Sequence, residues 1–241
     1  MPRGSDFTAR WTEGAWAELK ILEALNAEPD IVAVQYGITT GEAFWSSREM
    51  EARELPDQTA HGKRPDVLVF RRSSITDEEL AVVEKVCELD DGACEAVVRK
   101  AKLAIESEFS PYDYGHRLEQ YGKELSFTVK EEDLEPTKSW WSHFGVEIGI
   151  VQIFLDSAFM LPVSDLVAGI ADGSVKRSFE RSYGKYVYYP PMSRGVTFGM
   201  FAQRPEITAE ATLDRYGKYT AHRKVTGGNL AISDDVRTVI S

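Results

Sequence analysis

The sequence contains few cysteines and no long apolar segment. Cys87 and Cys94 are the only cysteines among 241 residues, and their spacing is not that of a disulfide framework. No run of about 18 apolar residues occurs, so no segment is expected to span a membrane. The first residues lack the apolar segment of a secretion signal. These absences predict a protein of the reducing cytoplasm with no membrane partner.

Several motifs of common enzyme classes are also missing. The sequence has no GxSxG nucleophile motif, no Walker phosphate loop, no GxGxxG motif and no paired CxxC. Its histidines show no metal-ligand spacing; they are His61, His116, His143 and His222. Serine hydrolases, nucleotide-binding enzymes and zinc proteins are therefore not indicated.

What the sequence does have is a sizeable apolar fraction and an uneven distribution of charge. Hydrophobic residues make up 43%, which at this length predicts one folded domain, residues 1–241. The net charge of −11 argues at first against a nucleic-acid partner. Residues 174–225, however, contain ten Lys and Arg against four Asp and Glu, with aromatic residues between them. This pattern fits either a surface for phosphates and bases or a solvated β-rich lobe with an aromatic core.

The order of expected helices and strands predicts an α/β core. Helices are expected at 12–26, 76–89, 93–102, 133–145 and 163–173, and strands at 31–39, 67–70, 103–108, 125–130 and 146–161. From about residue 175 the pattern changes to short strands and turns. We therefore expect a catalytic α/β core over residues 1–174 and a β-rich, DNA-contacting elaboration over residues 175–241.

Two acids stand at the end of a short apolar strand. Residues i and i+2 of a strand share a face, so Glu106 and Glu108 are expected to point the same way as Ala104. Burying unpaired carboxylates costs several kcal/mol each. Cations or a bound metal must therefore compensate for them.

A lysine and a third acid are expected near this pair. Asp66 directly precedes the strand 67–70, and Lys130 ends the strand 125–130 on its polar face. If strand 125–130 pairs in parallel with strand 103–108, Lys130 comes level with the two glutamates. Carboxylate oxygens suit Mg²⁺, and a lysine can orient or polarise water, so the cluster predicts phosphodiester hydrolysis.

These residues resemble the PD-(D/E)xK nuclease superfamily and, within it, the type II restriction endonucleases. The matching pieces are Arg64–Asp66 followed by a strand, and then Ile105–Glu108; the segments 126–136 and 148–161 and the stretch 227–232 are similar to a branch of restriction enzymes. The resemblance implies a mixed central β-sheet flanked by helices. It also implies Mg²⁺-dependent, sequence-specific cleavage of double-stranded DNA by a homodimer, as part of a prokaryotic restriction-modification system.

The resemblance assigns roles to individual residues. The metal-binding positions fall on Asp66 and Glu106, and the position of the family's lysine falls on Glu108, as in members that use E-x-E. Lys130 is our candidate to replace that lysine, although it could instead pair with Asp133 or Glu131. Glu18 matches a helix-borne acid that many members direct toward the site, or it is an ion-pair partner on its own helix.

DNA contacts are expected outside the acidic cluster. Reading base edges requires Arg, Lys, Asn or Gln in a groove, and backbone contacts require cations. The candidates are His116, Arg117, Arg194, Gln203, Arg204, Arg215, Arg223 and Lys224. Two other functions remain open: a repair or structure-specific nuclease on the same core, and a DNA-binding protein without catalysis.

Overall fold

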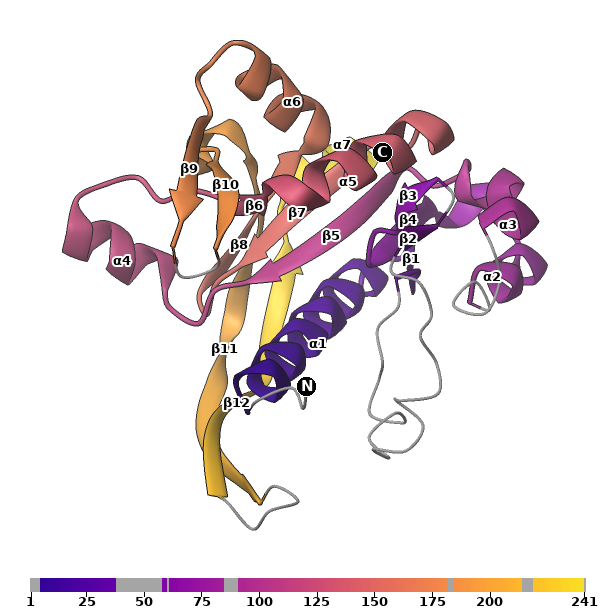
Figure 1. Ribbon diagram of the computed structural model, residues 1–241. Helices are drawn as coiled ribbons and strands as arrows, with labels where there is room; N and C mark the ends of the chain where they lie inside the picture. Colours follow the sequence, from indigo (N-terminus) through magenta and orange to yellow (C-terminus); the bar gives the residue numbers. More distant parts are fainter. Residues whose placement is uncertain are drawn as a thin grey trace.

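The computed structural model describes residues 5–37, 58–59, 61–84, 91–181, 184–213 and 219–240 (Figure 1). Its helices are α1 (Ser5–Asn26), α2 (Asp77–Glu84), α3 (Asp91–Val98), α4 (Tyr114–Tyr121), α5 (Glu131–Phe144), α6 (Val163–Ala171) and α7 (Asp234–Ile240). Its strands are β1 (Ile31–Gln35), β2 (Gln58–Thr59), β3 (Gly62–Lys63), β4 (Val67–Arg71), β5 (Leu103–Phe109), β6 (Val129–Lys130), β7 (Ile148–Ile153), β8 (Ser157–Pro162), β9 (Lys176–Glu180), β10 (Lys185–Tyr189), β11 (Val196–Leu213) and β12 (Tyr219–Ile232). Among these helices, none is long and apolar enough to cross a membrane.

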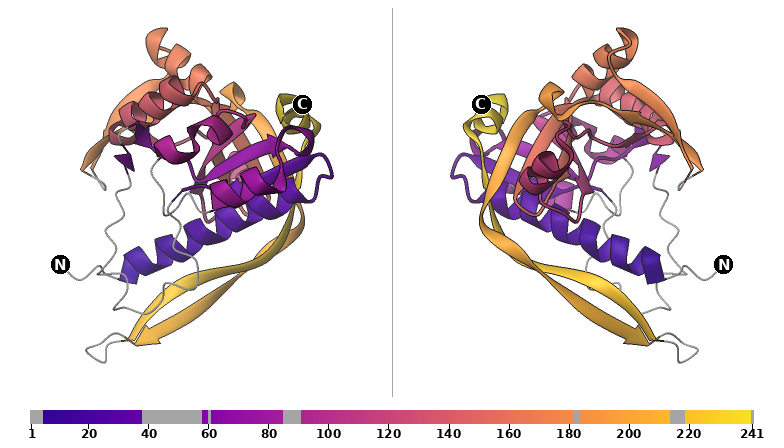
Figure 2. Two further views of the ribbon diagram at one scale, coloured as in Figure 1. Left: turned by 90° about the vertical axis from the view of Figure 1, so that its right-hand side faces the viewer. Right: turned by 90° about the vertical axis from the view of Figure 1, so that its left-hand side faces the viewer.

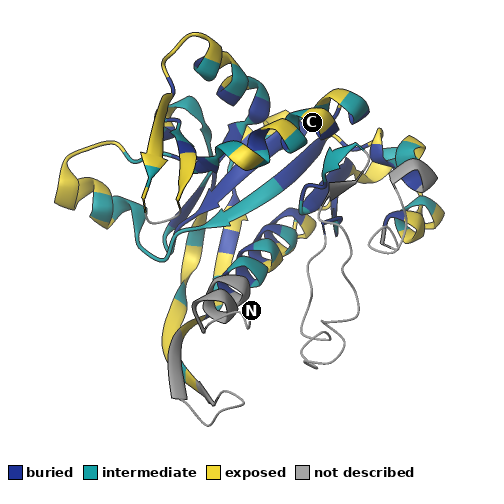
Figure 3. Cartoon of the chain, viewed as in Figure 1, coloured by how far each residue is buried: buried dark blue, intermediate teal, exposed yellow. Residues whose placement is uncertain are grey.

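A seven-stranded mixed sheet forms the centre of the molecule. Its strand order is β1-β4-β5-β7-β8-β11-β12, with β5 and β7 parallel and the other neighbours antiparallel. Helices α1 and α7 pack on one face, and α2, α3, α5 and α6 contribute to the core on the other face. The burial pattern in Figure 3 shows the central strands enclosed between these layers. The predicted mixed α/β sheet with flanking helices is confirmed.

Helix α1 is longer than the sequence indicated. Its apolar stripe is fully or almost fully buried against the sheet, including Ala17, Ile21 and Leu25. Thr12, where the sequence predicted the helix to begin, lies inside the helix, because the preceding turns contain no proline or glycine to stop it. The helix ends at Asn26, whose side-chain amide both donates to and accepts from Ala33 at 2.9 Å.

The apolar segment 146–161 forms two strands rather than one. Strands β7 and β8 pair antiparallel and are buried over most of their length. Asp156 joins the turn between them to the start of α4, since its carboxylate accepts from the backbone N–H groups of Tyr114 and Gly115 at 2.8 and 3.0 Å. The sequence predicted strand over residues 146–161 but did not reveal this reversal.

The expected pairing of strand 125–130 is wrong. Only β6 (Val129–Lys130) is a strand, and it pairs antiparallel with β10 in a separate three-stranded sheet. The parallel partner of β5 is β7. The backbone N–H of Phe127 instead donates to Pro190 at 2.9 Å, and its side chain is fully buried in the core. Lys130 therefore reaches the neighbourhood of β5 from another sheet.

The predicted β-rich C-terminal part is present, and its strands extend the central sheet. The short strands expected after residue 195 merge into β11 and β12, which pair along nearly their whole length. Their inner ends continue the sheet beside β8, while the outer part projects from the body alongside the N-terminal half of α1 (Figure 2). The functional division near residue 175 stays a prediction.

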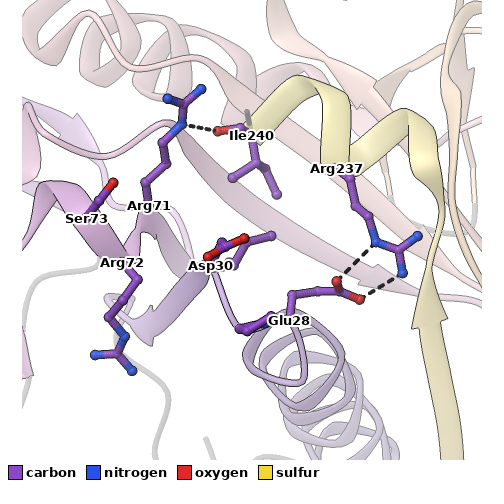
Figure 4. Close-up of a pocket in the computed structure, with 9 residues that line it drawn as sticks. Glu28, Asp30, Arg71, Arg72, Ser73, Arg237 and Ile240 are labelled. Atoms are coloured by element: carbon purple, nitrogen blue, oxygen red, sulfur yellow. Dashed lines mark hydrogen bonds and ion pairs between the residues drawn. The ribbon is translucent and has the colours of Figure 1, made fainter.

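Ion pairs attach the C-terminal helix to the opposite end of the chain. In the pocket of Figure 4, the Arg237 guanidinium forms two hydrogen bonds with the Glu28 carboxylate, at 2.8 and 3.1 Å. Outside the pocket, it also donates to Asp234 at 2.6 Å. Arg71 donates to the Ile240 carbonyl at 3.2 Å. Since Arg71 lies in β4, next to the edge strand β1, these contacts join α7 to this edge of the sheet.

We predict that Glu28→Gln lowers the unfolding temperature at pH 7 by a few degrees. The hydrogen bonds from Arg237 lower the pKa of Glu28 below its ordinary value, so this stabilisation is present above the unfolded-state pKa and is lost as acid protonates the carboxylate. Thermal unfolding of Glu28→Gln and of Glu135→Gln, in the exposed Glu135–Lys138 pair, provides the comparison. Equal unfolding temperatures for both variants at pH 7 would show that the Arg237 pair contributes nothing.

Candidate active site

Three carboxylates meet on one face of the central sheet. Val67 of β4 pairs with Ile105 of β5, and continuing this antiparallel register places Asp66 opposite Glu106. Glu108 shares the face of Glu106 two residues further along β5. The Asp66 Oδ2 atom accepts a hydrogen bond of 2.7 Å from the backbone N–H of Ser107. The aspartate is therefore tied to the backbone between the two glutamates, and the structure brings together the three acids that the sequence singled out.

The end of β1 holds the Asp66 backbone in place. The N–H groups of Tyr36 and Gly37 both donate to the Asp66 carbonyl, at 2.8 and 3.0 Å. A Cβ at Gly37 would lie 2.9 Å from the Asp66 Cα, so the two backbone segments approach more closely than a larger residue at position 37 permits. This contact fixes the point from which the Asp66 carboxylate extends toward Ser107.

Burial makes the ionised forms of these acids unfavourable. Desolvation raises the pKa of Asp66 to about 7, and the charge of Glu18 adds to this, while the Ser107 amide and Lys63 act against it. Desolvation and the Asp66 charge raise the pKa of Glu106 to about 8, against the effect of Lys63. The pKa of Glu108 is also raised, mainly by desolvation. Removal from water is therefore the main reason why these acids are harder to ionise than exposed ones.

Lys63 is a residue of this site that the sequence did not reveal. Its ammonium forms an ion pair with Glu106 Oε1. Burial lowers the pKa of Lys63, but Glu106, Asp133 and Asp66 together raise it, so the net pKa lies above its ordinary value. One indication of Lys63 was present in the sequence, its position three residues before Asp66. Strand β3, which carries Lys63, has only two residues and therefore no periodic pattern that could predict it.

Lys130 lies at the edge of the cluster. Its Nζ atom is 3.8 Å from Asp133 Oδ2, so the pairing with Asp133 considered from the sequence is present. Its charge also lowers the pKa of Glu108, against the larger effect of burial. Lys130 therefore contacts α5 and influences Glu108 at the same time.

Two further side chains lie near the carboxylates. Glu18 on α1 is partly buried, and its charge raises the pKa of Asp66, so the two acids are neighbours. Gln152 of β7 pairs with Glu108 in the sheet, is 4% exposed and donates to Ser110 Oγ at 2.9 Å. The sequence analysis did not single out Gln152, since one glutamine in an apolar strand carries no motif.

The donor set of the cluster suits a hard divalent cation. Asp66 and Glu106 offer carboxylate oxygens, and Glu106 already binds the cationic Lys63. No group of three or more His, Cys, Asp and Glu side chains in the described part of the chain is arranged to hold a metal. Mg²⁺, however, commonly binds through one or two carboxylates and keeps several waters. Asp66 and Glu106 fit that mode.

Four of the eight expected DNA-contacting residues pair with acids. Ion pairs involve Arg194 with Asp172 (3.2 Å), Arg204 with Asp113 (3.1 Å), Arg223 with Glu13 (3.3 Å) and Lys224 with Glu210 (2.7 Å). The Arg117 guanidinium lies 4.2 Å from the centre of the Tyr112 ring, and His116 and Gln203 are exposed. Arg215 lies outside the described residues. These placements leave the DNA contacts as predictions.

No protein-family model matches the chain, and no curated protein sequence matches it. The chain is similar to the solved structure of D212, a nuclease from a fusselovirus, with 11% sequence identity and a TM-score of 0.36. That alignment covers 82% of this chain and 90% of the other. At this TM-score the similarity carries no functional argument, so the function is argued from the carboxylate cluster.

The raised pKa values predict that the metal-free protein loses stability as pH rises. The pKa of Asp66 rises from 3.8 to about 7, and that of Glu106 from 4.5 to about 8. Between the lower and the upper pKa of each group, the folded state binds more protons than the unfolded chain. The free energy of unfolding should therefore fall across this window, by up to about 1.4 kcal/mol per pH unit for each group.

Urea unfolding between pH 5 and pH 8.5 in EDTA measures this slope. Asp66→Asn and Glu106→Gln should each make it shallower, whereas Glu135→Gln, an exposed acid on α5, should leave it unchanged. A wild-type stability that rises with pH over the same range would contradict the burial of ionisable carboxyls at this site.

Proposed function

We propose that this protein is a Mg²⁺-dependent endonuclease that hydrolyses phosphodiester bonds in double-stranded DNA. The observation that carries the proposal is the Asp66 carboxylate bonded to the Ser107 amide between Glu106 and Glu108. Grouping buried acids in this way lowers the stability of the fold, so stability does not explain it. Carboxyl groups with strongly shifted pKa values are common at functional sites. A divalent cation would offset their charge.

The reaction is hydrolysis at phosphorus. Oxygen from water adds to phosphorus as one P–O ester bond breaks, which leaves a phosphate monoester and a hydroxyl group. Asp66 and Glu106 would hold the Mg²⁺, which supplies Lewis-acid stabilisation of the charge that develops on the phosphate. Glu108 lies on the same face, where its carboxylate can accept a proton from the attacking water. Lys130 is proposed to offset the Glu108 charge.

The finer proposal is a type II restriction endonuclease. It is supported by the chain order of Arg64–Asp66 and Ile105–Glu108 in the sequence and by the projecting β11–β12 hairpin, which carries Arg204, Arg223 and Lys224 (Figure 2). A two-stranded ribbon of this kind can enter a DNA groove. We propose further that the enzyme acts as a homodimer on a palindromic site in a prokaryotic cytoplasm.

Digestion of a sequenced plasmid distinguishes three possible functions: a restriction enzyme, a repair or structure-specific nuclease, and a non-catalytic DNA-binding protein. A restriction enzyme gives discrete bands with one sequence at every cut end, whereas a repair or structure-specific nuclease gives a smear or cuts only distorted DNA. Binding without any cleavage in Mg²⁺ would indicate a non-catalytic DNA-binding protein.

We predict that Asp66→Asn and Glu106→Gln each lower the cleavage rate at least about 10²-fold while the protein still binds duplex DNA. Each change removes an ionic metal ligand and keeps the side-chain volume. Glu108→Gln is expected to be similarly severe. Cleavage should require Mg²⁺ or Mn²⁺ and stop in EDTA, and Ca²⁺ should support binding with little cutting. Full activity in EDTA would rule out the metal-dependent mechanism.

Lys130→Ala should lower the single-turnover rate about 10²-fold with little change in duplex binding, because the Glu108 carboxylate loses a nearby cation. Lys138→Ala is the matched control, since Lys138 lies on the same helix as Asp133 and pairs only with Glu135 in the described structure. A rate within a few-fold of wild type would restrict Lys130 to its pairing with Asp133.

A further inference from the structure

The ion pair between Lys63 and Glu106 places an ammonium at a carboxylate that we assign to the metal. The Lys63 side chain is 28% exposed and that of Glu106 is 15% exposed, so both charges are largely removed from water. The charge of Lys63 also lowers the pKa of Asp66 and of Glu108. Lys63 is thus the cation that acts on all three carboxylates.

Strand β3 is fixed against helix α5, and this fixes the direction of Lys63. Gly62 has a φ of +116°, and a Cβ there would lie 2.2 Å from the Pro136 carbonyl oxygen and 2.9 Å from the Trp140 nitrogen. On the other side of Gly62, the His61 ring stacks on His143 of α5, with ring centres 3.7 Å apart. A strand held this closely cannot shift without opening the contact with α5.

Lys63 and Lys130 differ in what they contact. The ammonium of Lys63 bonds directly to Glu106, whereas Lys130 is 41% exposed and 3.8 Å from Asp133. Only Lys63 therefore competes with a metal ion for a proposed ligand. The resemblance placed a lysine at the position of Glu108. In this chain, the lysine that contacts the cluster is Lys63, which comes from strand β3.

We propose that Lys63 is a catalytic residue of this site, that it holds Glu106 when no metal is bound, and that it contacts the scissile phosphate once the metal takes that carboxylate. The proposal rests on the proposed function. Two cations repel each other at one carboxylate, so metal binding drives the ammonium from Glu106 toward the nearest anion. With DNA bound, the scissile phosphate would join Asp133 and Asp66 as an anion near the ammonium, and its charge grows during the reaction.

Charge and position can be tested separately. Lys63→Gln removes the charge and should lower the single-turnover rate at least about 10²-fold relative to wild type. Lys63→Arg keeps the charge, so its rate should be at least about tenfold higher than that of Lys63→Gln. Duplex affinity in Ca²⁺ should change little. Lys138→Ala again serves as the control for loss of a paired lysine.

Metal binding provides a readout that does not depend on cleavage. In Lys63→Gln no ammonium competes for Glu106, so the affinity for Mn²⁺, measured by electron paramagnetic resonance at pH 9, should rise about three- to tenfold. Lys138→Ala, which removes a lysine paired with Glu135 on α5, should leave the Mn²⁺ affinity within about twofold of wild type.

Gly62→Ala tests whether β3 positions the lysine. It should reproduce the rate loss of Lys63→Gln although Lys63 is still present, because the added methyl group forces β3 away from Pro136. Gly173→Ala is the matched control: Gly173 also has a positive φ, +75°, but its added Cβ would meet nothing within 4 Å. Gly173→Ala should keep the wild-type rate.

Three results would overturn the inference. These are a Lys63→Gln rate within a few-fold of wild type, a weaker rather than tighter binding of Mn²⁺ by Lys63→Gln, and Gly62→Ala activity equal to that of Gly173→Ala. If the wild-type protein cleaves DNA but any of these occurs, the inference fails and the proposed function stands. If the wild type cleaves no DNA in Mg²⁺ or Mn²⁺, the proposed function fails instead, and the catalytic role of Lys63 fails with it.

Discussion

The hydrogen bond from the Ser107 amide to the Asp66 carboxylate is the contact on which the site depends. It joins the start of β4 to the end of β5 and sets an acid between two others on the same sheet face. Because a buried carboxylate without a partner costs several kcal/mol, the surrounding chain must supply cations and donors at this point. Strand β3 supplies Lys63, and the β6 end supplies Lys130.

The remaining architecture supports this arrangement from both faces of the sheet. The end of β1 donates two N–H groups to the Asp66 backbone, and α1 brings Glu18 near its carboxylate. On the other face, α5 carries Asp133 and holds β3 through the close approach to Gly62. A rigid sheet clamped between helices is the kind of support that a reactive cluster of like charges requires.

The sequence predicted the fold class and the three acids because both rest on local signals. Alternation in Leu103–Phe109 sets the face of Glu106 and Glu108, and the short strand after Asp66 has the apolar run of a central strand. Lys63 could not be predicted in this way, because its position follows from the packing of a two-residue strand on α5. The pairing of β6 and the long β11–β12 hairpin likewise depend on contacts between segments distant in sequence.

The central claim is that Asp66 and Glu106 together bind a divalent cation at the end of β5. Crystals grown with Mn²⁺ and measured at the manganese absorption edge test it most directly, because an anomalous difference map locates the ion without assumptions about activity. We predict a peak within about 2.3 Å of carboxylate oxygens from both residues, with the Lys63 ammonium withdrawn from Glu106. A well-occupied Mn²⁺ elsewhere, or none at this cluster at millimolar concentration, would contradict the account.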